Sequence, residues 1–189
     1  TDRSEYTAER LVITAGAWTS GMIPILDELA VPERQVLAWL QPLDGSLYTP
    51  EVFPVFNAYF DEGRYYGFPV FGIPGFKVGR YHHLEEVIDP DSEIKTVTGE
   101  DEAVLRSAVE RYFPKANGTT MTLKTCMFTN TPDEHFIVDL LPGNTQVAVA
   151  AGFSGHGFKF ASVIGEILAD LAITGETEHN IDLLKIDRF

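Results

Sequence analysis

The segment "AAGFSGHGFKF", from Ala150 to Phe160, lies where a strand passes into a helix. The residues leading into it, "QVAVAAG", are strongly apolar and predict a buried strand. After it, apolar side chains recur at helical spacing as far as Leu171, and Gly175 is a typical signal for the end of a helix. The segment therefore predicts a strand–turn–helix unit of α/β type.

The glycines of this turn allow two interpretations. A helix N-terminus presents unpaired N–H groups that attract anions, and glycine lets a ligand approach the backbone closely. Gly155 and Gly157 would permit that approach, and His156 and Lys159 could add charge. In the alternative, the glycines only satisfy the turn geometry. The spacing matches neither common phosphate-binding pattern, so a phosphate ligand is not indicated.

The rest of the chain predicts a second kind of structure between its two ends. "RLVITAG", residues 10–16, predicts a buried parallel strand, and "WTSGMIPILDEL" predicts a short helix or a turn. "TGEDEAVLRSAVERYFP" predicts a helix capped by Thr98, with the acidic run around Asp101 as its solvated start. Further strands are expected over residues 34–42, 52–60, 64–72, 75–83, 121–128 and 135–142.

These elements predict an α/β fold with an α+β region inserted in the chain. The middle section reads as a mostly antiparallel sheet with one helix, because a turn signal at 61–63 joins two of its strands. We expect domain boundaries that divide the chain into residues 1–31, 32–132 and 133–189. The first and last of these would form one domain.

Composition limits the classes of function. The chain has 189 residues, 44% of them hydrophobic, which indicates a packed core. The net charge of -14 disfavours nucleic acid as a partner, because binding it needs many cations. No apolar run is long enough to span a bilayer, so we expect no membrane partner.

The single cysteine, Cys126, excludes intrachain disulfides and cysteine-rich zinc sites. It indicates either a reducing compartment, which predicts a cytoplasmic location, or a cysteine that is kept for chemistry. We expect no metal site either, because His135 lies beside two acidic residues without a second ligand cluster. The chain lacks an initiator Met, and we expect it to be a fragment of a longer polypeptide.

Four stretches together resemble the C-terminal part of the monomeric sarcosine oxidase family, whose members include N-methyltryptophan oxidase and pipecolate oxidase. These stretches are "LVITAGAWTS", "YYGFPVFGIPGFKVGRYHH", "CMFTNTPDEHFIVD" and "GFSGHGFK", and the resemblance covers effectively the whole chain. It implies that residues 1–31 and 133–189 are part of a Rossmann-like FAD-binding domain. Residues 32–132 would then form a substrate-binding and catalytic domain around a mixed, mostly antiparallel sheet.

The resemblance also implies an activity. Members of the family use FAD to oxidise the C–N bond of a secondary amino acid, N-methyl or cyclic, to an imine, and O2 is reduced to H2O2. The family's G-x-G-x-x-G motif and a substrate-binding arginine belong to its first half and do not occur here. We therefore expect the missing N-terminal half in the same polypeptide or in a partner chain.

Three alternatives remain beside an oxidase. The chain could belong to a flavin dehydrogenase that passes electrons to another acceptor. It could be a non-catalytic fragment or binding module that lacks the flavin, or a domain of a multisubunit amine-oxidising complex. Sarcosine, a bulkier N-methyl amino acid, pipecolate and a glycated amino acid all remain candidate substrates.

Two residues would act on the flavin through side-chain chemistry. Cys126 resembles the family cysteine that forms a thioether to the flavin, and Lys124 nearby would favour its thiolate. The alternative for Cys126 is a small buried hydrophobic residue. Lys77 resembles the lysine that promotes oxygen activation, because a fixed cation stabilises developing negative charge. The alternative for Lys77 is a solvated strand lysine.

The substrate side of the site rests on a histidine and a tyrosine. His82 is the expected site histidine, able to take or give a proton, with His83 and Tyr81 as competing assignments. Tyr66 resembles a tyrosine that lines the substrate pocket, with core packing as the alternative. Tyr65 would point to the other face of the strand.

The resemblance also gives the glycine turn a role. The turn would face the end of the flavin where negative charge develops on reduction. The cofactor-binding residues expected there are Gly155, His156, Gly157 and Phe158. Lys159, in the first turn of the last helix, would bind the substrate carboxylate. Phe128 stands where the family often has tyrosine, so one hydroxyl near the substrate is missing.

Overall fold

The computed structural model describes residues 3–92 and 96–189, which form two compact units. The split unit comprises Thr1–Pro32 and Phe128–Phe189, and the central unit comprises Glu33–Met127. The predicted boundary before residue 32 lies one residue from the observed one, and the predicted boundary before residue 133 lies five residues beyond it. Residues 1–2 and 93–95 of the predicted domains lie outside the described residues.

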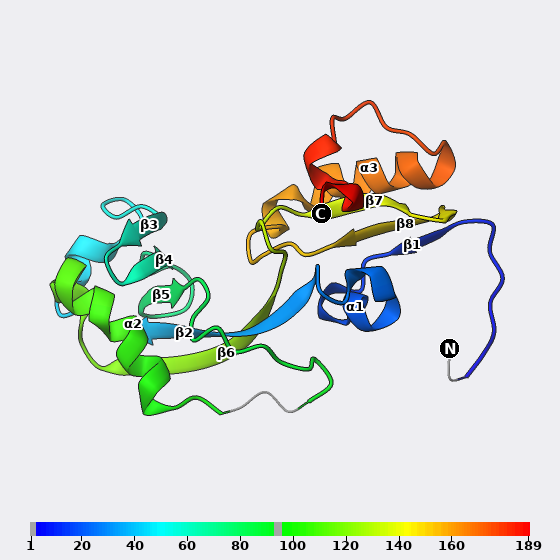
Figure 1. Ribbon diagram of the computed structural model, residues 1–189. Coiled ribbons are helices and arrows are strands. Elements are labelled where there is room, and N and C mark those ends of the chain that lie inside the picture. Colours follow the sequence, from blue (N-terminus) through cyan, green and yellow to red (C-terminus); the bar gives the residue numbers. More distant parts are fainter. Residues whose placement is uncertain (1–2, 93–95) are drawn as a thin grey trace. The chain divides into compact units, whose positions relative to one another are not determined.

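The order of helices and strands follows the sequence prediction closely (Figure 1). The strands are β1 (Leu11–Ile13), β2 (Val31–Leu40), β3 (Phe56–Phe60), β4 (Gly63–Phe68), β5 (Phe76–Arg80), β6 (Thr120–Asn130), β7 (Ile137–Leu141) and β8 (Asn144–Ala151). The helices are α1 (Thr19–Met22), α2 (Gly99–Tyr112) and α3 (Ala161–Ile173). β3 starts later than predicted, because Pro54 cannot donate to a strand ladder.

The split unit contains a mixed three-stranded sheet in the order β1-β8-β7, here called the small sheet. β1 runs parallel to β8, and β7 runs antiparallel to it. The sheet has a helical segment on each side, α3 on one and the α1 segment on the other (Figure 1). Alternation along β8 explains this, because Ala148 and Ala150 pack towards α3 while Val149 packs against Leu26 on the other side. The predicted α/β unit with a parallel strand pair is confirmed.

The prediction that the first strand is buried is wrong. Leu11 is 50% exposed and Val12 is 42% exposed. β1 is an edge strand of the small sheet, with β8 as its neighbour. Apolar, β-branched composition therefore identified a strand, but the burial of a strand depends on neighbours that composition does not specify.

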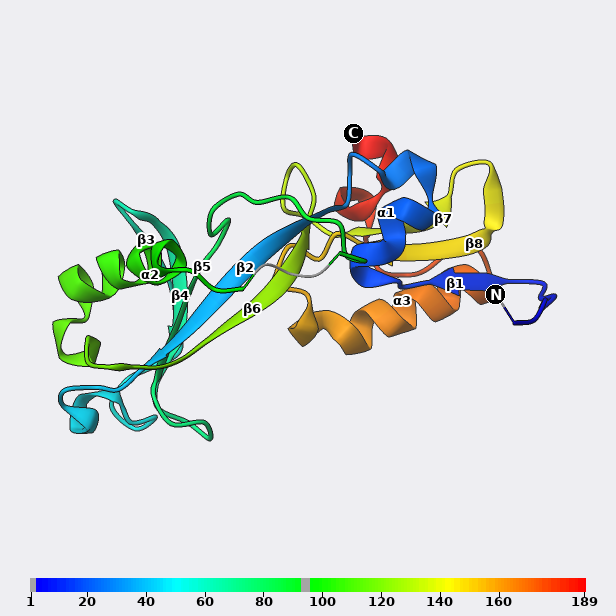
Figure 2. The ribbon, with the colours of Figure 1, turned by 90° about the horizontal axis from the view of Figure 1, so that it is seen from below.

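The central unit is built on a five-stranded sheet in the order β3-β4-β5-β2-β6, here called the large sheet. The β3–β4, β4–β5 and β2–β5 pairs are antiparallel, as predicted. Figure 2 shows β2 and β6 as long strands lying side by side. One face of the sheet packs against α2, where Phe76 and Val78 join a core cluster with Leu105 and Val109.

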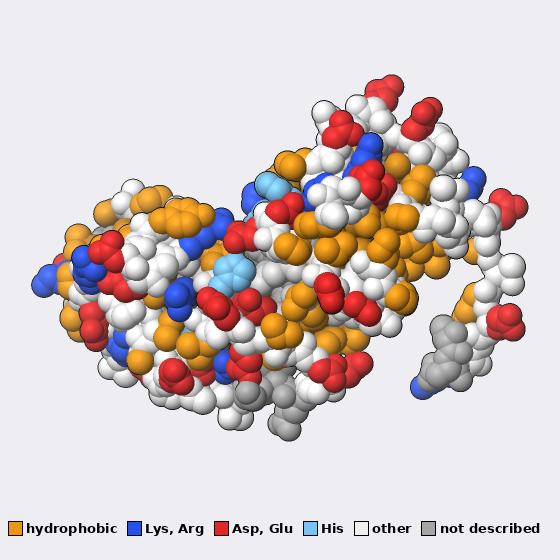
Figure 3. All heavy atoms as spheres, in the orientation of Figure 1, with side chains coloured by type: hydrophobic (Ala, Val, Ile, Leu, Met, Phe, Trp, Pro, Cys, Tyr) orange, Lys and Arg blue, Asp and Glu red, His pale blue; other side chains and the backbone are white. Residues whose placement is uncertain are grey.

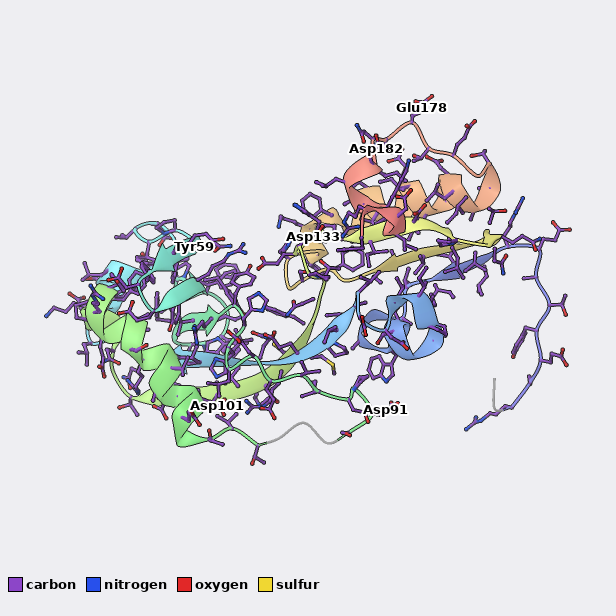
Figure 4. The ribbon with its side chains drawn as sticks, viewed as in Figure 1. Tyr59, Asp91, Asp101, Asp133, Glu178 and Asp182 are labelled. Atoms are coloured by element: carbon purple, nitrogen blue, oxygen red, sulfur yellow. The ribbon has the colours of Figure 1, made fainter. Side chains whose placement is uncertain are left out.

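The start of α2 confirms the predicted cap. The Thr98 hydroxyl accepts a hydrogen bond from Asp101 N at 3.3 Å, and Thr98 N donates to Asp101 Oδ2 at 2.7 Å. This reciprocal pair is a capping box, which satisfies two backbone donors at the end of the helix. Figure 4 labels Asp101 at this end of α2.

Acidic side chains are spread over the visible surface, in keeping with the net charge of -14 (Figure 3). Within residues 3–92 and 96–189, no helix is long and apolar enough to cross a bilayer.

Candidate functional site

The residues expected to act in catalysis gather on the face of the large sheet that is turned away from α2. We call this the opposite face, and the α2 side the helix face. Side chains alternate between the faces along each strand. On the opposite face Lys77 lies directly between Trp39 of β2 and Phe68 of β4. In the next row, Gly79 lies between Leu37 and Tyr66.

Lys77 is held between two aromatic rings. Its Nζ lies 5.1 Å from the ring centroid of Trp39 and 4.9 Å from that of Phe68. At such distances the ring faces attract the ammonium group. Lys77 is half-buried, so it is a placed cation rather than the solvated strand lysine of the alternative interpretation.

Cys126 lies on β6, beside β2, and is half-buried. Burial raises the pKa of its thiol, and the nearby positive charge of Lys77 opposes that rise. The sequence pointed to Lys124 as the cation that favours the thiolate, but Lys124 is exposed. The cation that acts on this thiol comes from β5, because strand pairing places distant segments closer than neighbours in sequence.

Tyr66 covers the gap that Gly79 leaves. A Cβ built on Gly79 would lie 2.5 Å from Tyr66 Cζ, so the phenol ring occupies the space above the glycine. The ring also packs against Tyr81, with centroids 5.1 Å apart. Burial raises the pKa of Tyr66, and the neighbouring Cys126 and Tyr81 raise it further. The hydroxyl therefore stays protonated and can donate a hydrogen bond.

Tyr65 points to the helix face, as predicted. It is part of the core beneath α2, and its hydroxyl donates to Val104 O at 2.8 Å. The two adjacent tyrosines thus serve different purposes, because Tyr65 packs the core and Tyr66 lies on the opposite face.

The two adjacent histidines also point to opposite sides. His82 Nδ1 lies 3.1 Å from Glu33 Oε2, and 38% of its side chain is exposed. His83 has no exposed surface, and its Nε2 lies 3.0 Å from Asp101 Oδ1 on the helix face. Burial lowers the pKa of His83, which favours a neutral ring. This placement favours His82 as the site histidine, although its role stays a prediction.

Tyr81, the third competing assignment, is part of an aromatic group. Its ring packs against Tyr66 and lies under the guanidinium of Arg64, whose Cζ is 4.0 Å from the ring centroid. Its hydroxyl accepts a long hydrogen bond from Asn57 Nδ2 at 3.5 Å. These contacts suit a residue that supports Tyr66.

The helix face carries a buried ionic cluster that the sequence analysis missed. Arg34 donates to Asp101 through two hydrogen bonds, of 2.7 and 2.9 Å. Asp101 is only 1% exposed, so the prediction of a solvated acidic start is wrong for this residue. The hydrogen bond from Arg34 holds the pKa of Asp101 well below its usual range, with further help from Thr98 and His83. The signal that could have found it is the Thr98-x-x-Asp101 spacing of a capping box.

The glycine turn of the split unit is shaped by its own backbone. Gly155 has φ +75°, and a Cβ built on it would lie 2.3 Å from Cε2 of Phe128. Only glycine tolerates both conditions. Ser154, which sequence reasoning missed, has φ +46° and is buried. Its hydroxyl accepts from Thr131 N and donates to Gly152 O, each at 3.2 Å. Positive φ at a non-glycine residue was not visible from the sequence.

Two of the predicted turn residues have side chains with other contacts. His156 Nε2 lies 3.1 Å from Glu134 O, and its ring is 4.8 Å from that of Phe136. The imidazole thus fastens the turn to the segment between β6 and β7. Phe158 is 96% exposed. Within the described turns and loops, the N–H groups of Gly155 and Gly157 donate to no backbone carbonyl.

The prediction that Lys159 lies in the first turn of the last helix is wrong. Lys159 lies in a short 3-10 turn, Phe158–Phe160, and α3 begins at Ala161. The side chain is exposed, and its Nζ donates to His156 O at 3.0 Å. The α-helix thus begins one turn later than the spacing of the apolar residues indicated.

No group of three or more metal-ligating side chains occurs among the residues that the structure describes. Asp133, close to His135, is paired with Arg188 at 2.8 Å and accepts a hydrogen bond from His135 N. Figure 4 labels Asp133 in the segment after β6. Asp133 therefore joins the C-terminal segment to the connection between β6 and β7, both within the split unit.

Comparison with known proteins assigns the chain to a family. Residues 1–171 match the FAD dependent oxidoreductase family, DAO. The chain is 46% identical over 192 residues to the monomeric sarcosine oxidase of Bacillus sp. (strain NS-129), covering all of this chain and 49% of that protein. It is 35% identical over 192 residues to N-methyl-L-tryptophan oxidase of Citrobacter koseri, covering 98% of this chain and 49% of that one.

Solved structures show the same fold at lower identity. The fructosamine oxidase of Aspergillus fumigatus (Amadoriase II) matches with a TM-score of 0.76 and 21% identity, over 98% of this chain and 46% of that one. NikD, an amino acid oxidase of nikkomycin biosynthesis, matches with a TM-score of 0.71 and 22% identity, over 97% and 49%. The chain thus spans about half the length of the relatives it matches. It belongs to the FAD dependent oxidoreductase family.

Proposed function

We propose that the complete polypeptide oxidises the C–N bond of a secondary amino acid, N-methyl or cyclic, to an imine, using FAD and reducing O2 to H2O2. One observation carries the proposal. In a chain of the FAD dependent oxidoreductase family, the thiol of Cys126, the ammonium of Lys77 and the phenol of Tyr66 share the opposite face of the large sheet. The similarity to sarcosine oxidases makes sarcosine the first substrate to try.

The residues present suit a flavin. When bound, a flavin accepts a hydride equivalent from the C–N bond and passes the electrons on to oxygen. Cys126 supplies a half-buried thiol, near the positive charge of Lys77, for covalent attachment. Gly155 lets the backbone of the turn pass directly against the ring of Phe128, where a Cβ would not fit, and its N–H and that of Gly157 suit a ligand that becomes negatively charged.

The charged and polar side chains then take distinct roles. Lys77, oriented by its two aromatic neighbours, stabilises negative charge as oxygen is reduced. Tyr66 lines the substrate pocket with a protonated hydroxyl. Lys159 binds the substrate carboxylate through its exposed ammonium. His82 moves or holds a proton near the amine.

The substrate class is narrowed by one departure. Phe128 packs against Gly155 and carries no hydroxyl, whereas the family that the sequence resembles often has tyrosine at this position. We therefore expect the enzyme to depend on apolar contact for the N-substituent. O2 and a small amino acid are the proposed partners, and the cytoplasm is the proposed compartment.

The test is made on the complete polypeptide from its source. Mass spectrometry is expected to find a flavin-sized addition on the Cys126 peptide, absent in Cys126→Ser. Sarcosine, an N-methyl amino acid, pipecolate and a glycated amino acid are then assayed for peroxide release. Turnover without peroxide would point to a dehydrogenase. A colourless protein without a flavin adduct would reject the proposal in favour of a non-catalytic role.

The glycine turn is tested by Gly155→Ala. The left-handed backbone alone should cost about 1–2 kcal/mol locally, the overlap of the new Cβ with Phe128 should add to that cost, and flavin occupancy should fall. Gly165→Ala is the matched control. Gly165 lies in α3 with no atom within 4 Å of an added Cβ, so its substitution should leave occupancy unchanged. Equal occupancy in both variants would remove the turn from the cofactor site.

A further inference from the structure

Glu33 is an acidic residue that is buried on a strand. It is 8% exposed on β2, with the same strand parity as Leu37 and Trp39, so it belongs to the opposite face. Buried carboxylates are costly unless they are hydrogen-bonded or paired. The Oε2 atom of Glu33 lies 3.1 Å from His82 Nδ1, which supplies such a partner.

The other oxygen of this carboxylate is also held. Gln35, which has no exposed surface, donates from Nε2 to Glu33 Oε1 at 2.5 Å. Gln35 is oriented in turn, because its Oε1 accepts from His83 N at 3.4 Å. The carboxylate plane of Glu33 is therefore set from two sides, and its orientation does not depend on His82 alone.

The backbone directs the imidazole onto this carboxylate. His82 has φ +51°, a left-handed conformation that is unfavourable for a non-glycine residue. Arg80 stabilises the turn, since its Nη1 donates to His83 O at 2.8 Å. The strained turn sends His82 towards Glu33 and His83 towards Asp101. Strain of this kind persists where the surroundings over-determine it.

Chemistry then assigns the tautomer. A carboxylate can only accept hydrogen bonds, so the hydrogen lies on Nδ1 of His82. In the neutral ring, Nε2 is then an acceptor. The side chain of His82 is 38% exposed, whereas Glu33 is only 8% exposed. A buried carboxylate therefore lies behind an accessible imidazole.

We propose that Glu33 is a positioning residue that fixes the Nδ1–H tautomer and the orientation of His82, so that Nε2 serves as the acceptor for the substrate amine, with Gln35 orienting Glu33. The role in turnover rests on the proposed function, whereas the tautomer does not. No bond is made or broken between the two residues. The proton on Nδ1 stays there while Nε2 acts.

The first measurement needs no variant of Glu33. Nitrogen-15 NMR of the complete, flavin-loaded polypeptide reports which ring nitrogen of His82 carries hydrogen, and the signal is assigned by its loss in His82→Asn. We expect the Nδ1–H form to dominate while the ring is neutral. A dominant Nε2–H form, or an even mixture, would overturn the proposal even if Glu33 variants fail to fold.

The second measurement uses Glu33→Gln, with Glu85→Gln as the matched control. Glu85 is exposed and lies in the same segment as His82. Glu33→Gln should mix the tautomers and lower kcat about tenfold with little change in KM, since orientation rather than binding is lost. Glu33→Asp should restore the tautomer in part. Glu85→Gln should change neither quantity.

The tautomer of His82 and the role of Glu33 in turnover can be contradicted separately. An unchanged tautomer in folded Glu33→Gln would reject the dyad whatever the activity. If Glu33→Gln mixes the tautomers but His82→Asn turns over at the wild-type rate, the assignment of Glu33 to catalysis is overturned together with the role of His82. Peroxide release in that same variant would leave the oxidase proposal intact.

Discussion

The two faces of the large sheet use the same residue types for different ends. On the helix face, His83 lies without exposed surface against Asp101, which also binds Arg34. On the opposite face, His82 pairs with Glu33 and keeps more than a third of its surface exposed. Glu33 and Arg34 are adjacent on β2, and His82 and His83 are adjacent after β5.

The difference shows that neighbouring positions on one strand place their charged side chains on opposite faces of the sheet, and that the face decides whether an ion pair is enclosed or accessible. A carboxylate on the helix face is enclosed by core and helix, so it contributes to holding α2 on the sheet. Glu33, one residue from Arg34 on β2, instead borders an accessible imidazole on the opposite face. Substitutions on the helix face should therefore change stability, and those on the opposite face should change reactivity.

The largest expected effect is that of Asp101→Asn. The change removes the carboxylate that accepts two hydrogen bonds from buried Arg34, leaves Glu86 at 3.8 Å as the more distant acidic neighbour, and weakens the cap of α2. Because Glu86 remains, the loss in the free energy of unfolding should lie near the lower end of the range of about 3–5 kcal/mol that breaking a buried pair costs. Urea unfolding of the complete polypeptide measures it. Lys77→Met, on the opposite face, should cost much less, and equal losses would erase the contrast between the faces.

A smaller effect concerns pH. Burial lowers the pKa of His83, so the unfolded chain takes up a proton at a higher pH than the folded chain. The stability it contributes is complete above the ordinary histidine pKa of about 6.5 and is lost as pH falls below it. The slope for one group is at most about 1.4 kcal/mol per pH unit. Asp101 acts in the same direction at lower pH, since its pKa is also lowered.

Urea midpoints of wild type and His83→Gln, between about pH 7.5 and about pH 5.5, check this slope. The wild type should lose more stability than the variant over that range. An identical slope would show that His83 titrates alike in the folded and unfolded chains. It would contradict the stabilising role that distinguishes the helix face from the opposite face.

The smallest effect is on the thiol of the opposite face. The charge of Lys77 opposes the burial that raises the pKa of Cys126. Lys77→Met should therefore raise that pKa further and slow alkylation of the flavin-free polypeptide about threefold to tenfold near neutral pH. Lys124→Met, on an exposed lysine two residues from the thiol, is the control and should react like the wild type. A larger effect from Lys124 would restore the assignment made from the sequence.

Much of the fold could be predicted from local signals. Alternation and turn residues located the strands of the large sheet, and Thr98 located the start of α2. The errors share a cause. Leu11 and Val12 read as buried from their composition, and Asp101 read as solvated from its charge. In each instance the environment was set by a segment far away in the chain.

Local sequence signals identified only some residues of the candidate site. Cys126, Lys77 and Tyr66 were identified by resemblance, and the structure brings them to one face. Sequence reasoning missed Glu33, because nothing in "VPERQVLAWL" distinguishes it from an exposed acidic residue. Ser154 escaped for a similar reason, since its strained backbone has no signature in its side chain.

The sequence by itself determined the α/β and antiparallel regions, the family and the candidate residue types, because periodicity, turn chemistry and motifs are local properties of a chain. Only the tertiary structure decided that His82 meets Glu33 while His83 meets Asp101, and that Lys77 rather than Lys124 acts on Cys126. The physical reason is strand pairing. It joins residues that are far apart in sequence, and a step of one residue exchanges one face of a sheet for the other.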